Sequence, residues 1–208
     1  MESRRITVLS AGLGVPSSSR LLADQLAASA EQQLAAAGYA VSVETVELRD
    51  IAVEIANNFV TGYAPPRLAE VIAAVEASDG IIAVSPVFSA SYSGLFKSFI
   101  DVLDPKSLDG KAVLLGATGG TDRHQMVLDY AMRPLFNYLR TRNAATGVFA
   151  GPQDWGTAGA GGAALSARIE RAAGEFSSLL KGSQPRQQPA PLESLPFEEL
   201  LAGITGRN

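Results

Sequence analysis

The sequence predicts an α/β protein: a three-layer α/β/α sandwich around a parallel five-stranded sheet with strand order 2-1-3-4-5. Strand-like and helix-like segments alternate five times along the chain, and most of the strands are apolar throughout. Such strands are typical of a parallel sheet that is covered on both faces. Only the second strand alternates apolar and polar residues, which suits an edge, and this order places strand 2 at an edge.

The first elements follow from short local patterns. Ile6–Leu9 predicts a buried strand. After a glycine-bearing loop, Ser18 or Ser19 can cap a helix whose apolar positions recur at helical spacing until Gly38. Residues 41–45 alternate, as on a strand with one solvated face.

The middle of the chain repeats the alternation. Residues 49–64 show no clear periodicity, and Pro65-Pro66 then opens a helix with apolar residues at helical spacing. Residues 81–84 and 112–115 predict two more buried strands. The helix between them carries an apolar stripe and stops before Pro105.

The remaining elements complete one domain over residues 1–182. We expect a helix from about His124 to Arg142, a last strand over Ala145–Phe149, and a final helix marked by Leu165, Ile169, Phe176 and Leu180. Residues 183–208 combine a Pro- and Gln-rich linker with a short amphipathic segment. That segment is too short to be a stable helix alone, so we expect it to dock on a folded surface.

Composition excludes several classes of function. A net charge of −4 shows no basic excess for nucleic acid, and no apolar run approaches the roughly 20 residues that span a membrane. The polar N-terminus leads directly into a strand, so we expect no signal peptide and a cytoplasmic protein. Cysteine is absent and His124 is the single histidine, so we expect no metal site. An enzyme of this composition would depend on a cofactor for its chemistry.

Three unusual loops follow strands 1, 3 and 4, whose carboxyl ends meet near the switch point of this strand order. The first, residues 10–20, places three serines and Arg20 at a helix start, where free N–H groups favour a phosphate. Serines that simply cap the helix explain this loop equally well. Ser17 stands where a dinucleotide fingerprint needs its third glycine, and no Walker lysine follows.

The other two loops are suited to a planar ring. Residues 86–97 offer backbone groups and two aromatic side chains after a strand end, although a turn with a serine cap would look the same. Residues 117–124 contain Gly119 and Gly120, which allow a ring to approach the backbone closely. The plain alternative is a flexible turn, with His124 as a solvated residue of the following helix.

Four segments taken together resemble the NADPH-dependent FMN reductase family, which has a flavodoxin-like fold: Pro86-Val87-Phe88, Tyr92-Ser93-Gly94-Leu95-Phe96-Lys97, Ala117-Thr118-Gly119-Gly120 and Asp129-Tyr130-Ala131-Met132-Arg133-Pro134. The resemblance runs from about Ile6 to Lys181. It is greatest to reductases that supply reduced flavin to two-component monooxygenases, in the subgroup that accompanies luciferase-like monooxygenases. The first loop departs from the family's common Gly-Ser-Pro-Arg form.

The resemblance implies FMN as the flavin, NADPH or NADH as the electron donor, and a monooxygenase as a possible partner. It implies that the FMN phosphate is held by Ser10, Ser17, Ser18 and Ser19. The ribityl chain and ring would lie along Pro86, Val87, Phe88 and Ser89. The pyrimidine edge would meet Thr118, Gly119 and Gly120.

The implied reaction is hydride transfer from nicotinamide C4 to flavin N5, which needs alignment of two rings and no catalytic side chain. Arg20 or Arg123 could bind the extra phosphate of NADPH. Three other functions are compatible with the sequence: a quinone or azo-dye reductase on the same scaffold, a non-catalytic electron carrier such as flavodoxin, and an interaction module that has lost flavin.

Pro134 lies within a strongly helical pattern but has no N–H for the carbonyl of Tyr130, which its ring would also crowd. A kink or one extra residue in the turn would relieve the clash, and an extra residue makes a π-helix. The resemblance favours a π-helix at Tyr130, packed across the interface of a homotetramer built as a dimer of dimers. An ordinary proline kink within one subunit is the alternative.

Overall fold

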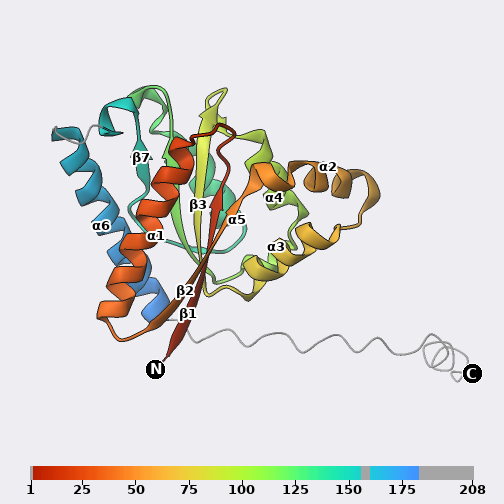
Figure 1. The fold of residues 1–208 in the computed structure, drawn as a ribbon, viewed down its shortest axis with the longest axis horizontal. Coiled ribbons are helices and arrows are strands. Elements are labelled where there is room, and N and C mark those ends of the chain that lie inside the picture. The colour runs from red at the N-terminus through yellow and green to blue at the C-terminus, as the bar shows by residue number, and fades with distance from the viewer. Residues whose placement is uncertain (1, 156–159, 183–208) are drawn as a thin grey trace, which may run out of the picture.

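The computed structural model describes residues 2–155 and 160–182 and shows the predicted sandwich (Figure 1). The strands β1 (Ser3–Ser10), β2 (Ala40–Glu47), β3 (Gly80–Phe88) and β5 (Ala112–Thr118) form a parallel sheet in the order β2-β1-β3-β5. The short strands β6 (Arg142–Asn143) and β7 (Val148–Ala150) both pair in parallel with β5 and complete the order 2-1-3-4-5. The boundary predicted at residue 182 and the amphipathic segment beyond it lie outside the described residues.

The predicted edge position of the second strand is confirmed. Among the described residues β2 pairs only with β1, with Ile6 opposite Val43, and its residues alternate between exposed and half-buried over residues 40–45. Strands β3 and β5, by contrast, are buried along most of their length. Burial on both faces explains why these strands read as continuous apolar runs in the sequence.

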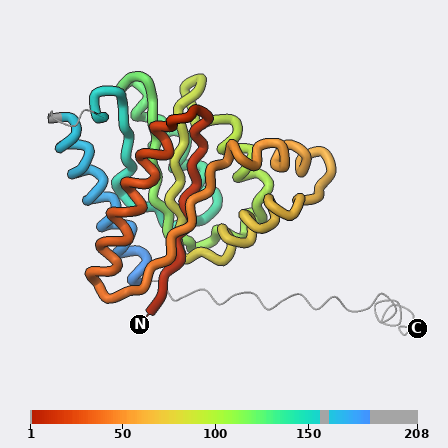
Figure 2. The backbone as a smooth tube through the Cα atoms, viewed as in Figure 1, coloured from red at the N-terminus to blue at the C-terminus, as the bar shows by residue number. Residues whose placement is uncertain are grey.

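Helices cover the two faces of the sheet and produce two hydrophobic cores. α1 (Ser18–Ala36) and α6 (Ala160–Lys181) pack together on one face, over residues such as Val8 and Ile82. The opposite face, with Leu9 and Ile81, is covered by α2 (Ala52–Thr61), α3 (Pro66–Ala77), α4 (Gly94–Val102) and α5 (Arg133–Tyr138) (Figure 2). Successive strand residues enter opposite cores because side chains alternate across a sheet.

Helix ends in the first half follow the sequence signals closely. α1 is followed by Gly38 at φ +87, where the N–H of Gly38 donates to Ala35 O at 2.9 Å and that of Tyr39 donates to Leu34 O at 3.1 Å. This is a glycine-ended helix, as predicted. The helix predicted at Pro65-Pro66 begins at Pro66. The undetermined segment 49–64 contains a 3₁₀ turn, Leu48–Ile51, followed by α2.

The last strand differs from its prediction, which placed one strand over Ala145–Phe149. β6 and β7 are instead separated by residues 144–147, so the predicted strand is wrong in its first half. In this gap the side chain of Glu175 accepts hydrogen bonds from Thr146 N at 2.6 Å and from Thr146 Oγ1 at 2.8 Å. A carboxylate of α6 thus replaces the sheet partner that the backbone lacks here.

The helix predicted over His124–Arg142 is interrupted and ends earlier, at Tyr138. A 3₁₀ turn covers Asp122–His124, and a π-helix follows over Leu128–Met132, where the N–H of Arg133 donates to Leu128 O five residues back. The predicted π-helix around Tyr130 is confirmed. One extra residue in the turn accommodates Pro134, which has no N–H to offer.

Candidate flavin site

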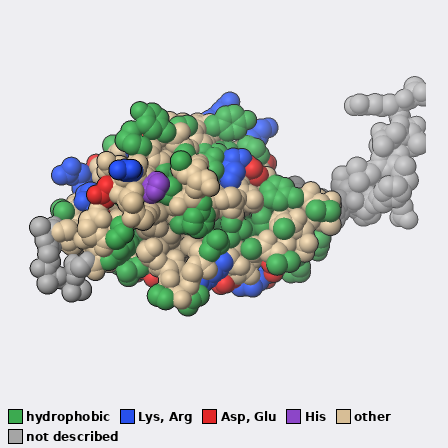
Figure 3. All heavy atoms as spheres, turned by 90° about the horizontal axis from the view of Figure 1, so that it is seen from above, with side chains coloured by type: hydrophobic (Ala, Val, Ile, Leu, Met, Phe, Trp, Pro, Cys, Tyr) green, Lys and Arg blue, Asp and Glu red, His purple; other side chains and the backbone are tan. Residues whose placement is uncertain are grey.

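The three loops singled out in the sequence gather at the carboxyl edge of the sheet, at the top of Figure 1. Figure 3 looks onto this edge and shows hydrophobic side chains scattered among the backbone and uncharged polar side chains. The strands β1, β3 and β5 end here at Ser10, Phe88 and Thr118. Parallel strands bring their carboxyl ends to one edge, so this convergence follows from the topology.

Ser17 is the residue that caps α1, so the prediction of Ser18 or Ser19 as the cap is wrong. Its backbone is extended, and its Oγ accepts a hydrogen bond from the N–H of Arg20 at 3.2 Å. The hydroxyl hydrogen of Ser17 remains free to donate, because the cap uses only the oxygen. Ser18 becomes the first helical residue and is exposed.

Gly12 leaves the space that Ser17 fills. A Cβ on Gly12 would overlap Ser17 Oγ and would lie 3.2 Å from the Cβ of Ser19. The loop therefore closes over a residue without a side chain. Close packing of the chain on itself accounts for Gly12 without any direct contact to a ligand.

Ser10 ends β1 directly before this loop, is fully buried, and has a hydroxyl without a hydrogen-bond partner among the described residues. Leaving a buried hydroxyl unpaired costs about 1–3 kcal/mol. Ser19 is also buried, but its Oγ lies 2.7 Å from Oγ1 of Thr118. The two serines therefore differ: Ser10 lacks a partner, whereas Ser19 joins the first loop to the third.

The second loop is a β-hairpin rather than an irregular loop. β3 continues to Phe88, Ser89 and Ala90 turn with φ of 48° and 66°, and β4 (Ser91–Tyr92) returns antiparallel. Two left-handed residues are typical of a type I′ hairpin turn. Ser93 then caps α4 by accepting from Phe96 N at 3.1 Å. The hairpin carries Val87 and Phe88 beyond the carboxyl edge, where Pro86 pairs with Thr118, and places Ser89 at its tip.

The loops enclose a cleft of ≈ 380 Å³. Seven residues predicted from the resemblance lie in its wall, and two more come from the segment after β7; the lining consists of Ser18, Pro86, Val87, Phe88, Thr118, Gly119, Gly120, Pro152 and Trp155. Ser89 is not part of this wall, and neither are Ser10, Ser17 and Ser19. The sequence reasoning missed Pro152 and Trp155, although the chain's single tryptophan, directly after the last strand, is a usable signal.

A second cavity of ≈ 360 Å³ lies beside the π-helix and shares no residue with this wall. Its lining includes the carboxylates of Asp122, Asp129 and Asp154 and one cation, Arg168. Carboxylates repel a phosphorylated ligand, whereas the described residues in the wall of the first cleft include none. The charges therefore favour the first cleft for a nucleotide.

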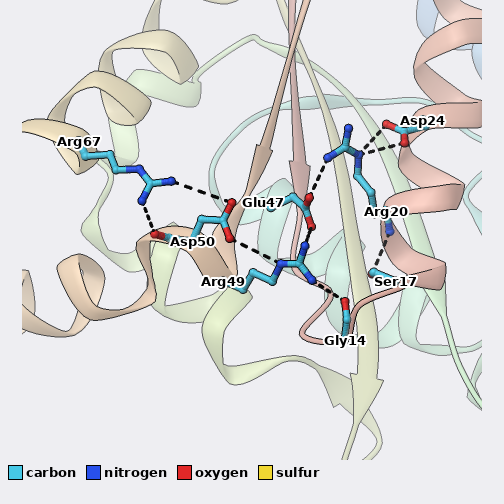
Figure 4. A network of polar contacts seen from close by, with 8 residues as sticks. All are labelled: Gly14, Ser17, Arg20, Asp24, Glu47, Arg49, Asp50 and Arg67. Atoms are coloured by element: carbon cyan, nitrogen blue, oxygen red, sulfur yellow. Dashed lines mark hydrogen bonds and ion pairs between the residues drawn. The ribbon is translucent and has the colours of Figure 1, made fainter.

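The two arginines considered for NADPH, Arg20 and Arg123, lie in different environments. Figure 4 shows the polar network around Arg20. Arg20 donates to Asp24 at 2.8 Å and to Glu47 at 2.9 Å, and the bonds to Asp24 raise the pKa of its guanidinium. Arg49 also pairs with Glu47, at 2.8 Å, and donates to the carbonyl of Gly14 at 2.5 Å. Arg123 is exposed and has no ion pair within the described part of the chain.

No helix within residues 2–155 and 160–182 is long and apolar enough to cross a membrane. The same residues contain no cluster of three or more histidine or acidic side chains arranged to hold a metal ion.

Comparison with known proteins gives one family match: residues 4–156 match the family described as NADPH-dependent FMN reductase. An FMN reductase (NADPH) of Pseudomonas aeruginosa is 34% identical over 178 residues, which cover 86% of this chain and 93% of the relative. The NADH-dependent FMN reductase SfnF of Pseudomonas fluorescens is 33% identical over 181 residues, which cover 85% of this chain and 94% of that protein.

Solved structures agree on the fold. An oxidoreductase from Corynebacterium diphtheriae superposes with a TM-score of 0.85 at 42% identity, covering 88% of this chain and all (100%) of that one. The apo form of the NADH:FMN oxidoreductase EMOB superposes with a TM-score of 0.74 at 23% identity, covering 92% of this chain and 97% of that chain. At that identity the second likeness concerns the fold alone.

Proposed function

Since this chain belongs to the NADPH-dependent FMN reductase family, we propose that the cleft between its three carboxyl-edge loops is the place where FMN and the nicotinamide nucleotide meet. The chain is an NAD(P)H:FMN oxidoreductase with a flavodoxin-like fold. The observation that carries the location of the site is the lining of the cleft, which brings together residues from all three loops and, within the described part of the chain, contains no carboxylate.

The phosphate end of FMN suits the first loop. Ser18 is exposed at the first turn of α1, Ser17 keeps a free hydroxyl hydrogen, and the helix N-terminus adds unpaired N–H groups. Ser10, whose hydroxyl has no partner among the described residues, ends β1 just before this loop, and that hydroxyl would gain a partner if a ligand or its bound water reached it. We assign these three serines to the phosphate.

The ring end suits the other loops. Pro86, Val87 and Phe88 form one side of the cleft, and Gly119 and Gly120 form another with little side-chain bulk. Trp155 adds an aromatic surface that can pack against a planar ring. Ser89, at the hairpin tip, is left out of this assignment.

FMN, when bound, supplies the chemistry by accepting a hydride from the nicotinamide. The chain's own part is to hold the two rings in contact and to keep water away from them. The walls of the cleft offer backbone groups and apolar side chains for both tasks. None of the described side chains in the cleft wall is an acid or a base, so we assign no proton transfer to them.

The function is tested by adding NADPH to the purified full chain and following its oxidation with free FMN, and in parallel with a quinone. We expect turnover that saturates with FMN and exceeds turnover with the quinone. Preference for the quinone would instead favour a quinone reductase. Flavin that stays bound without steady-state NADPH oxidation would favour an electron carrier.

Arg123 is our choice for the extra phosphate of NADPH, because Arg20 is already held by two carboxylates. Arg123→Gln is expected to lower kcat/KM for NADPH roughly fivefold, which corresponds to the loss of about 1 kcal/mol from an exposed ion pair. The value of kcat/KM for NADH should stay nearly unchanged. Steady-state rates with both nucleotides check this. Arg171→Gln, an exposed arginine of α6, is the matched control. An equal loss with both nucleotides would contradict a role in phosphate recognition.

We also infer that the π-helix packs across a subunit interface in a dimer of dimers. Two tyrosines support this, because Tyr130 on the π-helix is 78% exposed and Tyr138 on α5 is 80% exposed in the single chain. Large aromatic side chains exposed on neighbouring elements are typical of a surface that another subunit covers. Sedimentation should give four chains per particle, and Tyr130→Ser should lower that mass. A monomer, or a tetramer indifferent to this substitution, would argue for an ordinary surface.

Reduced FMN made in this cleft would be delivered to a monooxygenase, as the resemblance of the loop motifs suggests. A monooxygenase that uses FMNH₂ should become active when NADPH, FMN and this chain are supplied together. Activity that requires a separate flavin reductase would contradict this role.

A further inference from the structure

One buried hydrogen bond joins the two ends of the proposed flavin site. Ser19 Oγ and Thr118 Oγ1 lie 2.7 Å apart, and the two residues are 1% and 3% exposed. Ser19 is in the first turn of α1, beside the serines assigned to the phosphate. Thr118 is the last residue of β5, directly before the two glycines assigned to the ring.

Thr118 is also the point where the ring-lining segments meet. Its backbone is paired in register with Pro86 of β3 on one side and with Ala150 of β7 on the other. The N–H of Gly119 then donates to Ala150 O at 3.2 Å. The ring-lining segments are therefore connected in one backbone hydrogen-bonded layer, and the bond from Ser19 attaches the phosphate-binding turn to that layer.

Ser19 is poorly placed to donate its hydroxyl hydrogen directly to a phosphate. A serine has one hydroxyl hydrogen. If Ser19 donates it to Thr118, none remains for a ligand, and if Ser19 accepts, its hydrogen must still reach a ligand from a residue that is almost fully enclosed. Its neighbour Ser18, by contrast, is exposed and lines the cleft.

We propose that Ser19 and Thr118 are positioning residues whose hydrogen bond couples occupancy of the phosphate turn to the placement of the ring-binding loop. This inference rests on the proposed function. A phosphate that orders the first turn of α1 would fix Ser19, and through Thr118 it would fix Gly119 and Gly120 in the geometry that the ring requires. Such coupling is reciprocal, so a bound ring must favour phosphate by the same factor.

The experiment separates the two ends of FMN by using riboflavin for the ring and inorganic phosphate for the phosphate turn. In the unmodified full chain, saturating phosphate is expected to raise riboflavin affinity about two- to tenfold over chloride of equal ionic strength, the range of one net hydrogen bond. Quenching of riboflavin fluorescence measures this. The same phosphate must compete with FMN, which shows that it occupies the turn.

The variants test whether the bond carries the effect. Ser19→Ala and Thr118→Val should each remove the phosphate effect, and the double variant should lose no more than either single one. Thr118→Ser, which keeps the hydroxyl, should retain it. Ser177→Ala is the matched control, since Ser177 is a buried serine of α6 whose hydroxyl has no hydrogen-bond partner among the described residues.

The outcomes distinguish this inference from the function on which it rests. A phosphate effect that survives in both single variants, or losses of FMN affinity that multiply in the double variant, would overturn the link. So would phosphate that competes with FMN in the unmodified chain but leaves riboflavin affinity unchanged, a result that needs no variant. Failure of the unmodified chain to bind FMN or oxidise NADPH would overturn the proposed function itself.

Discussion

Gly120→Val should weaken FMN binding and NADPH oxidation strongly while leaving the fold intact. Gly120 lines the cleft, and a Cβ placed on it meets no heavy atom within 4 Å, so valine fits the folded chain and we expect its bulk to reach the space assigned to the ring. Forcing such bulk into a fitted site costs about 1–3 kcal/mol, or roughly five- to 150-fold in FMN affinity. Flavin fluorescence and NADPH oxidation measure the loss.

Thermal unfolding of the flavin-free protein provides the control, because an exposed substitution should change stability by no more than about 0.5 kcal/mol. Gly94→Ala adds a side chain in equally open space outside the cleft and should leave FMN binding unchanged. Gly119 is a less specific probe than Gly120. A Cβ there would lie 3.0 Å from the ring of Phe149 and 3.2 Å from His124 Cβ, so Gly119→Val would disturb the fold as well. Full FMN affinity in Gly120→Val would place the ring elsewhere.

Ser18→Ala should weaken the binding of FMN much more than the binding of riboflavin. The hydroxyl of Ser18 is exposed in the first turn of α1 and is assigned to the phosphate, and a hydrogen bond to a charged group is worth about 1.5–3 kcal/mol. FMN affinity should therefore fall roughly ten- to 150-fold, whereas riboflavin affinity should stay within about twofold because riboflavin has no phosphate. Titration of both flavins into one protein sample measures the difference.

Two further variants sharpen this test. Ser17→Ala should lose FMN affinity and also about 0.5–2 kcal/mol of stability, because Ser17 caps the helix. Ser29→Ala, in the middle of the same helix, should alter neither flavin's affinity. Losses of affinity of equal size for FMN and riboflavin in Ser18→Ala would contradict the assignment of the FMN phosphate to this turn.

The sequence by itself determined the layers, the strand order and the edge at which the loops converge. These follow from local periodicity: apolar runs such as 81–84 and 112–115 require cover on both faces, and the alternating residues of strand 2 require an edge. A break in the regular helix near Tyr130 was also predictable, because Pro134 cannot donate a hydrogen bond wherever the rest of the chain lies. The choice of a π-helix over a simple kink came from the family resemblance. Each of these constraints lies within a few residues of the element that it shapes.

Only the tertiary structure decided how the loop residues are used. Ser17, Ser18 and Ser19 are equivalent in the sequence, yet one caps α1, one faces the cleft and one bonds to Thr118. Arg20 is held by Glu47, and Trp155 joins the cleft wall, through contacts between distant parts of the chain. Such contacts depend on side-chain direction and register across the sheet, which periodicity along the chain does not encode.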